Sequence, residues 1–171
     1  MISKKLEKAL NEHLNYELLS AYVYAAHAAY FDDLNLTGFS NWMKIQVQEE
    51  IAHGVKFYNF INDIGGRVVM DAIAKPPTTF DSPLVAFQEV LDHERSVTKR
   101  IYKLVDLARE ESHHATETFL AWFVNEQVEE EANADSVVQK LKLIGKDTQG
   151  LFWLDRELAA RTVEPAGPSA T

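Results

Sequence analysis

The chain has 171 residues, a length that suits one domain with a substantial buried core. Acidic residues outnumber basic ones by 26 to 17. The resulting formal net charge of −9 argues against nucleic acid and anionic membranes as partners and favours the attraction of cations. The sequence contains no cysteine, which excludes disulfides, thiolate zinc sites, iron–sulfur clusters and a cysteine nucleophile.

The N-terminal residues lead directly into a charged amphipathic segment and lack the apolar region of a signal peptide. The longest uncharged run near this end, residues 18–31, is too short to span a bilayer. The sequence therefore predicts a cytoplasmic protein that does not enter a membrane.

Apolar residues recur at helical spacing through most of the chain and predict four long helices and a short fifth one. Ser3 suits the N-cap of the first helix, and Asp81 or Ser82 suits that of the third. Gly65 and Gly145 are typical C-terminal stops. The expected ranges are 3–31, 37–64, 83–111 and 115–144, with a short helix from 147.

The lengths of the connections predict how these helices are arranged. Short links join the first and third helices to their successors as antiparallel pairs, whereas residues 65–82 suit a crossover along the bundle. The predicted fold is all-α, a four-helix bundle with a long crossover, parallel second and third helices, and a short fifth C-terminal helix. We expect residues 1–161 to form the domain and residues 162–171 a flexible tail. The apolar fifth helix is expected to pack against other subunits.

The stretch 48–54 places a carboxylate and an imidazole on one helix face. Glu50 and His53 are three residues apart, a spacing at which two side chains can bind one metal ion. The residues that share this face are apolar: Phe39, Met43, Val47, Phe57 and Ile61. A carboxylate buried in such a stripe is costly unless it is paired or binds a metal, so Glu50 requires partners from other helices.

The other three long helices carry the same anomaly. Apolar stripes on them are interrupted by Glu17, Glu94, Gln127 and Glu130. Glu17 and Glu50 are 33 residues apart, as are Glu94 and Gln127, and another polar side chain follows three residues after the second member of each pair. We interpret this as a two-fold internal pattern that brings six polar groups together at one depth of the bundle.

The chemistry of these groups indicates a metal site. Hard oxygen ligands with one or two imidazoles suit iron(II) or manganese better than copper or structural zinc. The four glutamates would balance the charge of two divalent ions, and Gln127 adds a neutral donor and acceptor. Because carboxylates favour the ferric state by charge, the expected reaction is the oxidation of two Fe(II) ions by O2 or H2O2.

Several neighbours of the expected centre have two interpretations. Tyr24, two turns from Glu17 on the same face, either contributes a hydrogen bond or an electron to the reaction or packs in the core, which is the more common role. Glu49, Glu126 and Glu129 either hold a third cation or form a solvated acidic patch.

Two segments resemble the ferroxidase motifs of bacterial non-haem ferritins: Glu-Glu-x-x-His-Gly at 49–54 and Asn-Glu-Gln-Val-Glu-Glu-Glu at 125–131. The resemblance extends over about residues 1–161 and implies a ferritin-like bundle in a hollow shell of 24 subunits that stores ferric oxyhydroxide. It also implies the iron ligands: Glu17, Glu50 and His53 for a first ion; Glu50, Glu94 and Glu130 for a second, with Glu50 bridging and Gln127 close to both; and Glu49, Glu126, Glu129 and Glu130 for a third.

Related families match the sequence less well. Bacterioferritins have a second Glu-x-x-His where this chain has residues 127–130, and a haem-ligating Met where it has Ile51, so no haem is expected. Rubrerythrin-type peroxidases carry a cysteine iron domain, which this chain lacks. Mini-ferritins that coat DNA lack the fifth helix.

Two other functions stay open at this point. A di-iron oxidoreductase acting on an organic substrate would use the same ligands but needs a substrate pocket, whereas bulky aromatic residues predict a filled core. A structural bundle would pair its buried acids with Lys or His, yet few basic residues fall on the inner stripes. The histidines other than His53 are interpreted as structural, although His13 lies one turn from Glu17.

Overall fold

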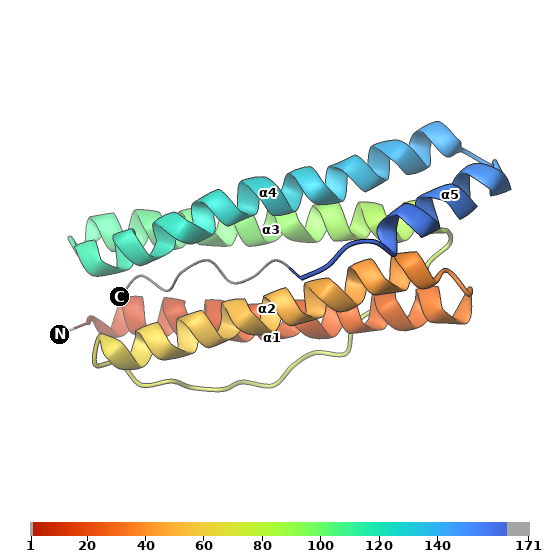
Figure 1. The fold of residues 1–171 in the computed structure, drawn as a ribbon. Coiled ribbons are helices and arrows are strands. Elements are labelled where there is room, and N and C mark those ends of the chain that lie inside the picture. Colours follow the sequence, from red (N-terminus) through yellow and green to blue (C-terminus); the bar gives the residue numbers. More distant parts are fainter. Residues whose placement is uncertain (1, 164–171) are drawn as a thin grey trace.

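The computed structural model describes residues 2–163 and contains five helices and no strand within that range. The helices are α1 (Lys4–Asp33), α2 (Thr37–Asp63), α3 (Pro83–Glu110), α4 (His114–Ile144) and α5 (Thr148–Leu158). The first four form a bundle, and α5 lies at one end of it between α2 and α4 (Figure 1). The predicted fold class is confirmed, and each end of a long helix lies within about two residues of its expected position.

Local signals in the sequence set the helix ends. Ser3 Oγ accepts a hydrogen bond from the Leu6 N–H at 3.0 Å. Ser82 Oγ accepts one from the Val85 N–H at 3.2 Å, which decides between the two cap candidates for α3. Gly145 follows α4 with φ of +59°, a left-handed conformation that glycine adopts at little cost.

The connections arrange the helices as predicted. Figure 1 shows two antiparallel hairpins, α1 with α2 and α3 with α4, and a crossover that makes α2 and α3 run parallel. Asn11 fastens this crossover to α1, since its Nδ2 donates to the Arg67 carbonyl and its Oδ1 accepts from the Val69 N–H at 2.6 Å. Asn15 Oδ1 accepts from the Asp71 N–H at 2.7 Å. These bonds satisfy backbone groups of a segment without regular structure.

The apolar core is divided into two clusters, one at each end of the bundle. The cluster at the α5 end includes Tyr24, Phe31, Phe39, Met43, Phe87 and Leu141. The other includes Leu6, Leu14, Phe57, Ile101, Leu120 and Phe123. Along each long helix the residues expected at the metal centre fall between the positions that these clusters use. The sequence therefore builds a polar layer at mid-depth with apolar packing on both sides.

Helix α5 packs against the bundle of its own chain, which the sequence did not predict. Leu154 and Leu158 are buried, and Asp155 Oδ1 accepts a hydrogen bond from the Gly38 N–H at 2.8 Å. Part of the apolar surface of α5 is therefore used within its own chain, because α2 and α4 leave an apolar face that α5 covers. The expectation that α5 packs against other subunits stays a prediction. Phe152 and Trp153 point outward and remain exposed.

No helix within residues 2–163 has both the length and the apolar character needed to cross a bilayer. The expected flexible tail, residues 162–171, lies mostly outside the described residues. The domain limits of 1–161 stay a prediction.

Candidate metal centre

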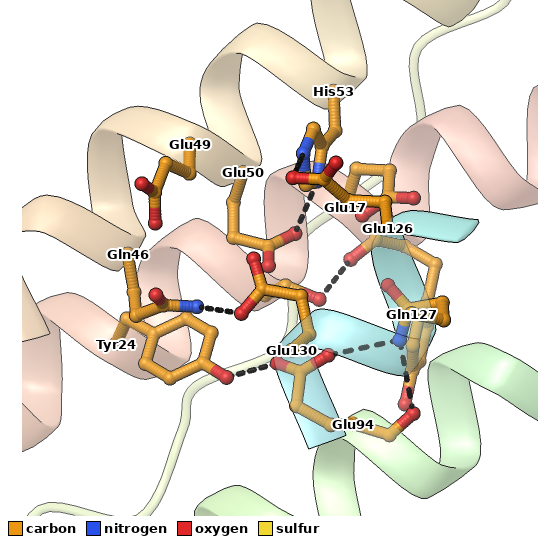
Figure 2. Close-up of polar contacts among 12 residues, drawn as sticks. Glu17, Tyr24, Gln46, Glu49, Glu50, His53, Glu94, Glu126, Gln127 and Glu130 are labelled. Carbon is orange, nitrogen blue, oxygen red and sulfur yellow. Dashed lines mark hydrogen bonds and ion pairs between the residues drawn. The ribbon is translucent and has the colours of Figure 1, made fainter. Parts of the chain in front are cut away.

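The polar layer contains the six residues expected to converge. They are Glu17 from α1, Glu50 and His53 from α2, Glu94 from α3, and Gln127 and Glu130 from α4. Each is buried, with at most 4% of its surface exposed. Figure 2 shows their side chains directed toward one another in the interior of the bundle.

Glu17, Glu50 and His53 form the tighter part of this layer. One ligand atom from each lies within 4.8 Å of the others, a group that could hold a metal ion. Oε2 of Glu17 and Oε2 of Glu50 accept no hydrogen bond from the described part of the chain, whereas Oε1 of Glu17 has the His13 imidazole 2.7 Å away. Buried carboxylate oxygens without donors are costly, and a bound cation removes that cost. The donor set therefore fits a hard divalent ion such as iron(II).

A second group of possible ligand atoms shares His53. Glu126 and Glu130 of α4 each bring a carboxylate oxygen within 4.8 Å of the His53 ring and of each other. His53 Nε2 lies 3.7 Å from Glu126 Oε1, and His53 Nδ1 lies 3.7 Å from Glu50 Oε2 (Figure 2). The imidazole thus lies between the carboxylates of Glu50 and Glu126. The sequence did not predict the contact with Glu126.

Glu94 and Glu130 are held by hydrogen bonds. Tyr24 donates its hydroxyl to Glu94 Oε1, and Gln127 Nε2 donates to Glu94 Oε2 at 3.1 Å. Gln46 Nε2 donates to Glu130 Oε2 at 2.9 Å (Figure 2). Among the described residues, Glu50, Glu94 and Glu130 do not bring three ligand atoms within 4.8 Å of one another, as Glu17, Glu50 and His53 do. The second ligand set implied by the resemblance therefore stays a prediction.

Burial and mutual repulsion control the protonation of these carboxyls. Burial raises the pKa of Glu94 to about 7, and burial together with the charge of Glu94 raises the pKa of Glu130 to about 8. Burial and the charge of Glu17 raise the pKa of Glu50 well above its usual range. Burial opposes ionisation of Glu17 too, but His13, Glu50 and His53 together outweigh it and lower the pKa of Glu17 to about 2. Metal ions and protons therefore compete for this layer.

Two residues that touch the centre were not assigned to it from the sequence. His13, interpreted as structural, is buried, and its Nε2 lies 2.7 Å from Glu17 Oε1. Gln46 contacts Glu130 and is fully buried. Each lies four residues before a predicted ligand, His13 before Glu17 and Gln46 before Glu50. That one-turn spacing, noted for His13 but not for Gln46, is the signal that could have found them.

The four glutamates expected at a third site line one cavity of about 460 Å³ between α2 and α4: Glu49, Glu126, Glu129 and Glu130. Arg161, which the sequence did not implicate, also lines this cavity, and its Nη2 lies 2.8 Å from Glu49 Oε2. The acidic side chains thus line a cavity and are not fully solvated, and one basic side chain lies among them.

A family model described as the ferritin-like domain matches residues 7–144. The chain belongs to the ferritin family. It is 42% identical to the bacterial non-heme ferritin of Staphylococcus aureus strain USA300 over 164 residues, which cover 96% of this chain and 99% of that protein. It is 44% identical to the bacterial non-heme ferritin of Staphylococcus epidermidis over 162 residues, or 95% of this chain and 98% of that protein.

Solved ferritin structures have the same fold. An open-pore ferritin from the hyperthermophilic archaeon Archaeoglobus fulgidus matches with a TM-score of 0.94 and 51% identity, covering 95% of this chain and 99% of that chain. A humanized archaeal ferritin matches with a TM-score of 0.95 and 49% identity, covering 96% and 100%. The resemblance to ferritins inferred from the two sequence motifs is confirmed over nearly the whole chain.

Proposed function

We propose that this chain is an iron-storage ferritin, which oxidises Fe(II) at the buried centre and keeps the ferric product as an oxyhydroxide mineral inside a cage of 24 subunits. The observation that carries the proposal is the group formed by Glu17, Glu50 and His53, whose ligand atoms lie within 4.8 Å of one another. Two of its carboxylate oxygens, Oε2 of Glu17 and Oε2 of Glu50, accept no hydrogen bond within the described chain. Membership of the ferritin family and the names of the relatives support iron as the cation.

Each buried residue has a proposed role toward the iron substrate. Glu17, Glu50 and His53 bind the first ion. Glu50, Glu94 and Glu130 bind the second, with Gln127 close to both. The two ions together lose two electrons, which reduce one O2 to H2O2, or one H2O2 to two waters, with the uptake of two protons. The surrounding carboxylates stabilise the higher charge of the ferric products.

Tyr24 is proposed to act through Glu94. Its hydroxyl donates to the Glu94 carboxylate, and burial followed by the charge of Glu94 raises the pKa of Tyr24 well above its usual range. The phenol therefore keeps its proton and holds one oxygen of Glu94 in place. Glu49, Glu126, Glu129 and Glu130 are proposed to bind a third iron ion in the cavity beside the centre. No haem is proposed, since Ile51 stands where bacterioferritins carry their haem ligand.

Iron loading tests the proposal directly. Excess Fe(II) is added aerobically to the purified protein, which is then separated by size, and iron atoms per chain are counted. We expect many iron atoms per chain on a large particle. About two per chain would indicate a di-iron enzyme without storage, and none would contradict the proposal altogether.

Replacing Glu50 tests the centre itself. Glu50→Ala is expected to slow Fe(II) oxidation at least about 100-fold, because removal of a ligand weakens a metal site more than removal of an outer hydrogen-bond partner does. The cage is expected to assemble, since the change removes buried charge and little packing. Glu89→Ala, which removes an exposed glutamate from α3, is the matched control. Equal rates in both variants would show that Glu50 does not bind the reacting iron.

A further inference from the structure

The cavity between α2 and α4 is partly closed by the chain that follows α5. Ala160, Arg161 and Thr162 line it together with Glu49 of α2 and the acidic side chains of α4. Figure 1 shows this segment turning back from α5 and running between α2 and α4. Part of the cavity wall is therefore supplied by residues far from the ligand motifs in the sequence.

The Arg161 side chain is held in this wall by two residues of α2. Its Nη2 donates to Glu49 Oε2 at 2.8 Å, its Nη1 donates to the Trp42 carbonyl at 3.4 Å, and its guanidinium carbon lies 4.5 Å from the centre of the Trp42 ring. Asn41 Nδ2 donates to the carbonyl oxygens of Leu158 and Arg161, which holds the backbone in place. The Arg161 side chain is only 20% exposed.

The charge of this guanidinium opposes a metal ion in the cavity. Arginine stays positive at every pH at which proteins fold. It also uses an oxygen of Glu49 that a metal ion at the third site would require. Like charges close together in a partly buried site repel strongly, and mobile salt screens them less there than at an open surface.

We propose that Arg161 is the counter-charge of Glu49 and sets the affinity of the acidic cavity for the third iron ion, which must displace the guanidinium from Glu49 to bind. This inference rests on the proposed function of the cavity. Each binding event breaks a charge-assisted hydrogen bond, so iron in the cavity is held more weakly than iron in the buried centre. The cavity then exchanges iron readily instead of retaining it.

Anaerobic calorimetric titration of the assembled, metal-free protein with Fe(II) tests the role of Arg161 without relying on oxidation. Arg161→Gln removes the charge and keeps a hydrogen-bonding side chain. It is expected to raise the affinity for the third ion about tenfold, because the repulsion between two positive charges is lost. The binding of the two ions of the buried centre is expected to change less than that of the third ion, although Glu130 is shared, because Arg161 bonds to Glu49, which belongs to the third site alone.

Two further variants separate charge from packing. Arg161→Lys keeps a positive charge beside Glu49 and is expected to tighten binding of the third ion less than Arg161→Gln does. Arg156→Gln removes a positive charge from α5 at a side chain that stacks on Trp153 and does not line the cavity. It is expected to leave all three affinities unchanged.

Distinct outcomes separate this inference from the proposed function. An unchanged third affinity in Arg161→Gln, with two ions still bound at the buried centre, would overturn the role of Arg161 and leave the proposed ferroxidase centre standing. Equal tightening in Arg156→Gln or Arg161→Lys would also overturn it, because general charge or altered packing would then be responsible. Absence of any Fe(II) binding in the wild-type protein would contradict the proposed function instead.

Discussion

His13 contacts the proposed iron ligand Glu17, with 2.7 Å between Nε2 and Oε1. Burial alone would raise the pKa of Glu17, and His13, together with Glu50 and His53, lowers it to about 2. His13→Phe keeps an aromatic ring against Phe57 and removes the attraction to the imidazole. In this variant protons compete more effectively with the metal ion for Glu17, and they do so most at low pH. We therefore expect the affinity for the first Fe(II) to fall about tenfold at pH 6 and less at pH 8. Anaerobic titration at both pH values measures the effect.

A matched change elsewhere on α1 controls for lost packing. His27 is also buried, and it stacks on Phe80 with 4.2 Å between ring centres. His27→Phe should leave the affinity for Fe(II) unchanged at both pH values. A loss of the same size in both variants would mean that His13 supports the bundle and not Glu17.

The convergence of six polar side chains could be predicted because a buried charge inside an apolar stripe is conspicuous. His13 and Gln46 carry the same signal, but imidazole and amide groups are often satisfied within their own helix, so the pattern does not separate a partner of the centre from a structural residue. Arg161 could not be predicted. Its contact with Glu49 depends on where α5 docks and on the direction in which the chain then turns.

At the scale of whole elements, α5 docks through a close backbone approach. A Cβ atom added to Gly38 would lie 1.6 Å from the carbonyl oxygen of Asp155. The Asp155 carboxylate also accepts hydrogen bonds from the N–H groups of Gly38 and Phe39, which caps the first turn of α2 and complements its dipole. Glycine at position 38 is therefore required by the packing of α5 and not by a special backbone angle.

Gly38→Ala should consequently displace α5. The clash is with backbone, which cannot rotate away, so we expect a loss of about 1–3 kcal/mol in the free energy of unfolding, as overpacked sites show. Chemical denaturation of the assembled protein measures it. Asp155→Ala is expected to cost about 1 kcal/mol through loss of the cap. Asp155→Asn keeps an acceptor oxygen and should cost less. An unchanged stability in Gly38→Ala would show that α5 is not held in this position.

Sequence patterns predicted the helices themselves better than they predicted what each helix packs against. Helical spacing and caps located all five helices, and the lengths of the connections decided the direction of α2 relative to α3. The apolar face of α5 was also visible in the sequence. A pattern of this kind says that a face is covered but not what covers it, and so the docking of Leu154 and Leu158 on the same chain required the structure.

For the molecule as a whole, the buried carboxyls link stability to pH. The pKa values of Glu94 and Glu130 are raised from 4.5 to about 7 and about 8, with burial the main cause in each case. The folded state therefore holds these protons more tightly than the unfolded chain. The stabilisation is complete below pH 4.5 and is lost as the pH rises through 7 and 8. Glu17, with its lowered pKa, loses its contribution only in strong acid, as the pH falls from 4.5 toward 2.

The metal-free protein is thus expected to become less stable from pH 5 to pH 8, since both raised carboxyls ionise without a counter-charge in that window. Thermal unfolding without oxygen should show a falling midpoint, and Mn(II), which does not oxidise under these conditions, should restore it at pH 8 far more than at pH 5. The double variant Glu94→Gln and Glu130→Gln removes both titrations. Its midpoint should fall less over the same range, because only Glu50 keeps a raised pKa among these carboxyls, and Mn(II) should raise the midpoint less than in the wild type, because only the ligands of the first ion remain. A midpoint that rises with pH in the metal-free wild type would mean that these carboxyls are compensated by protein groups, and the layer would then have no need of a metal ion.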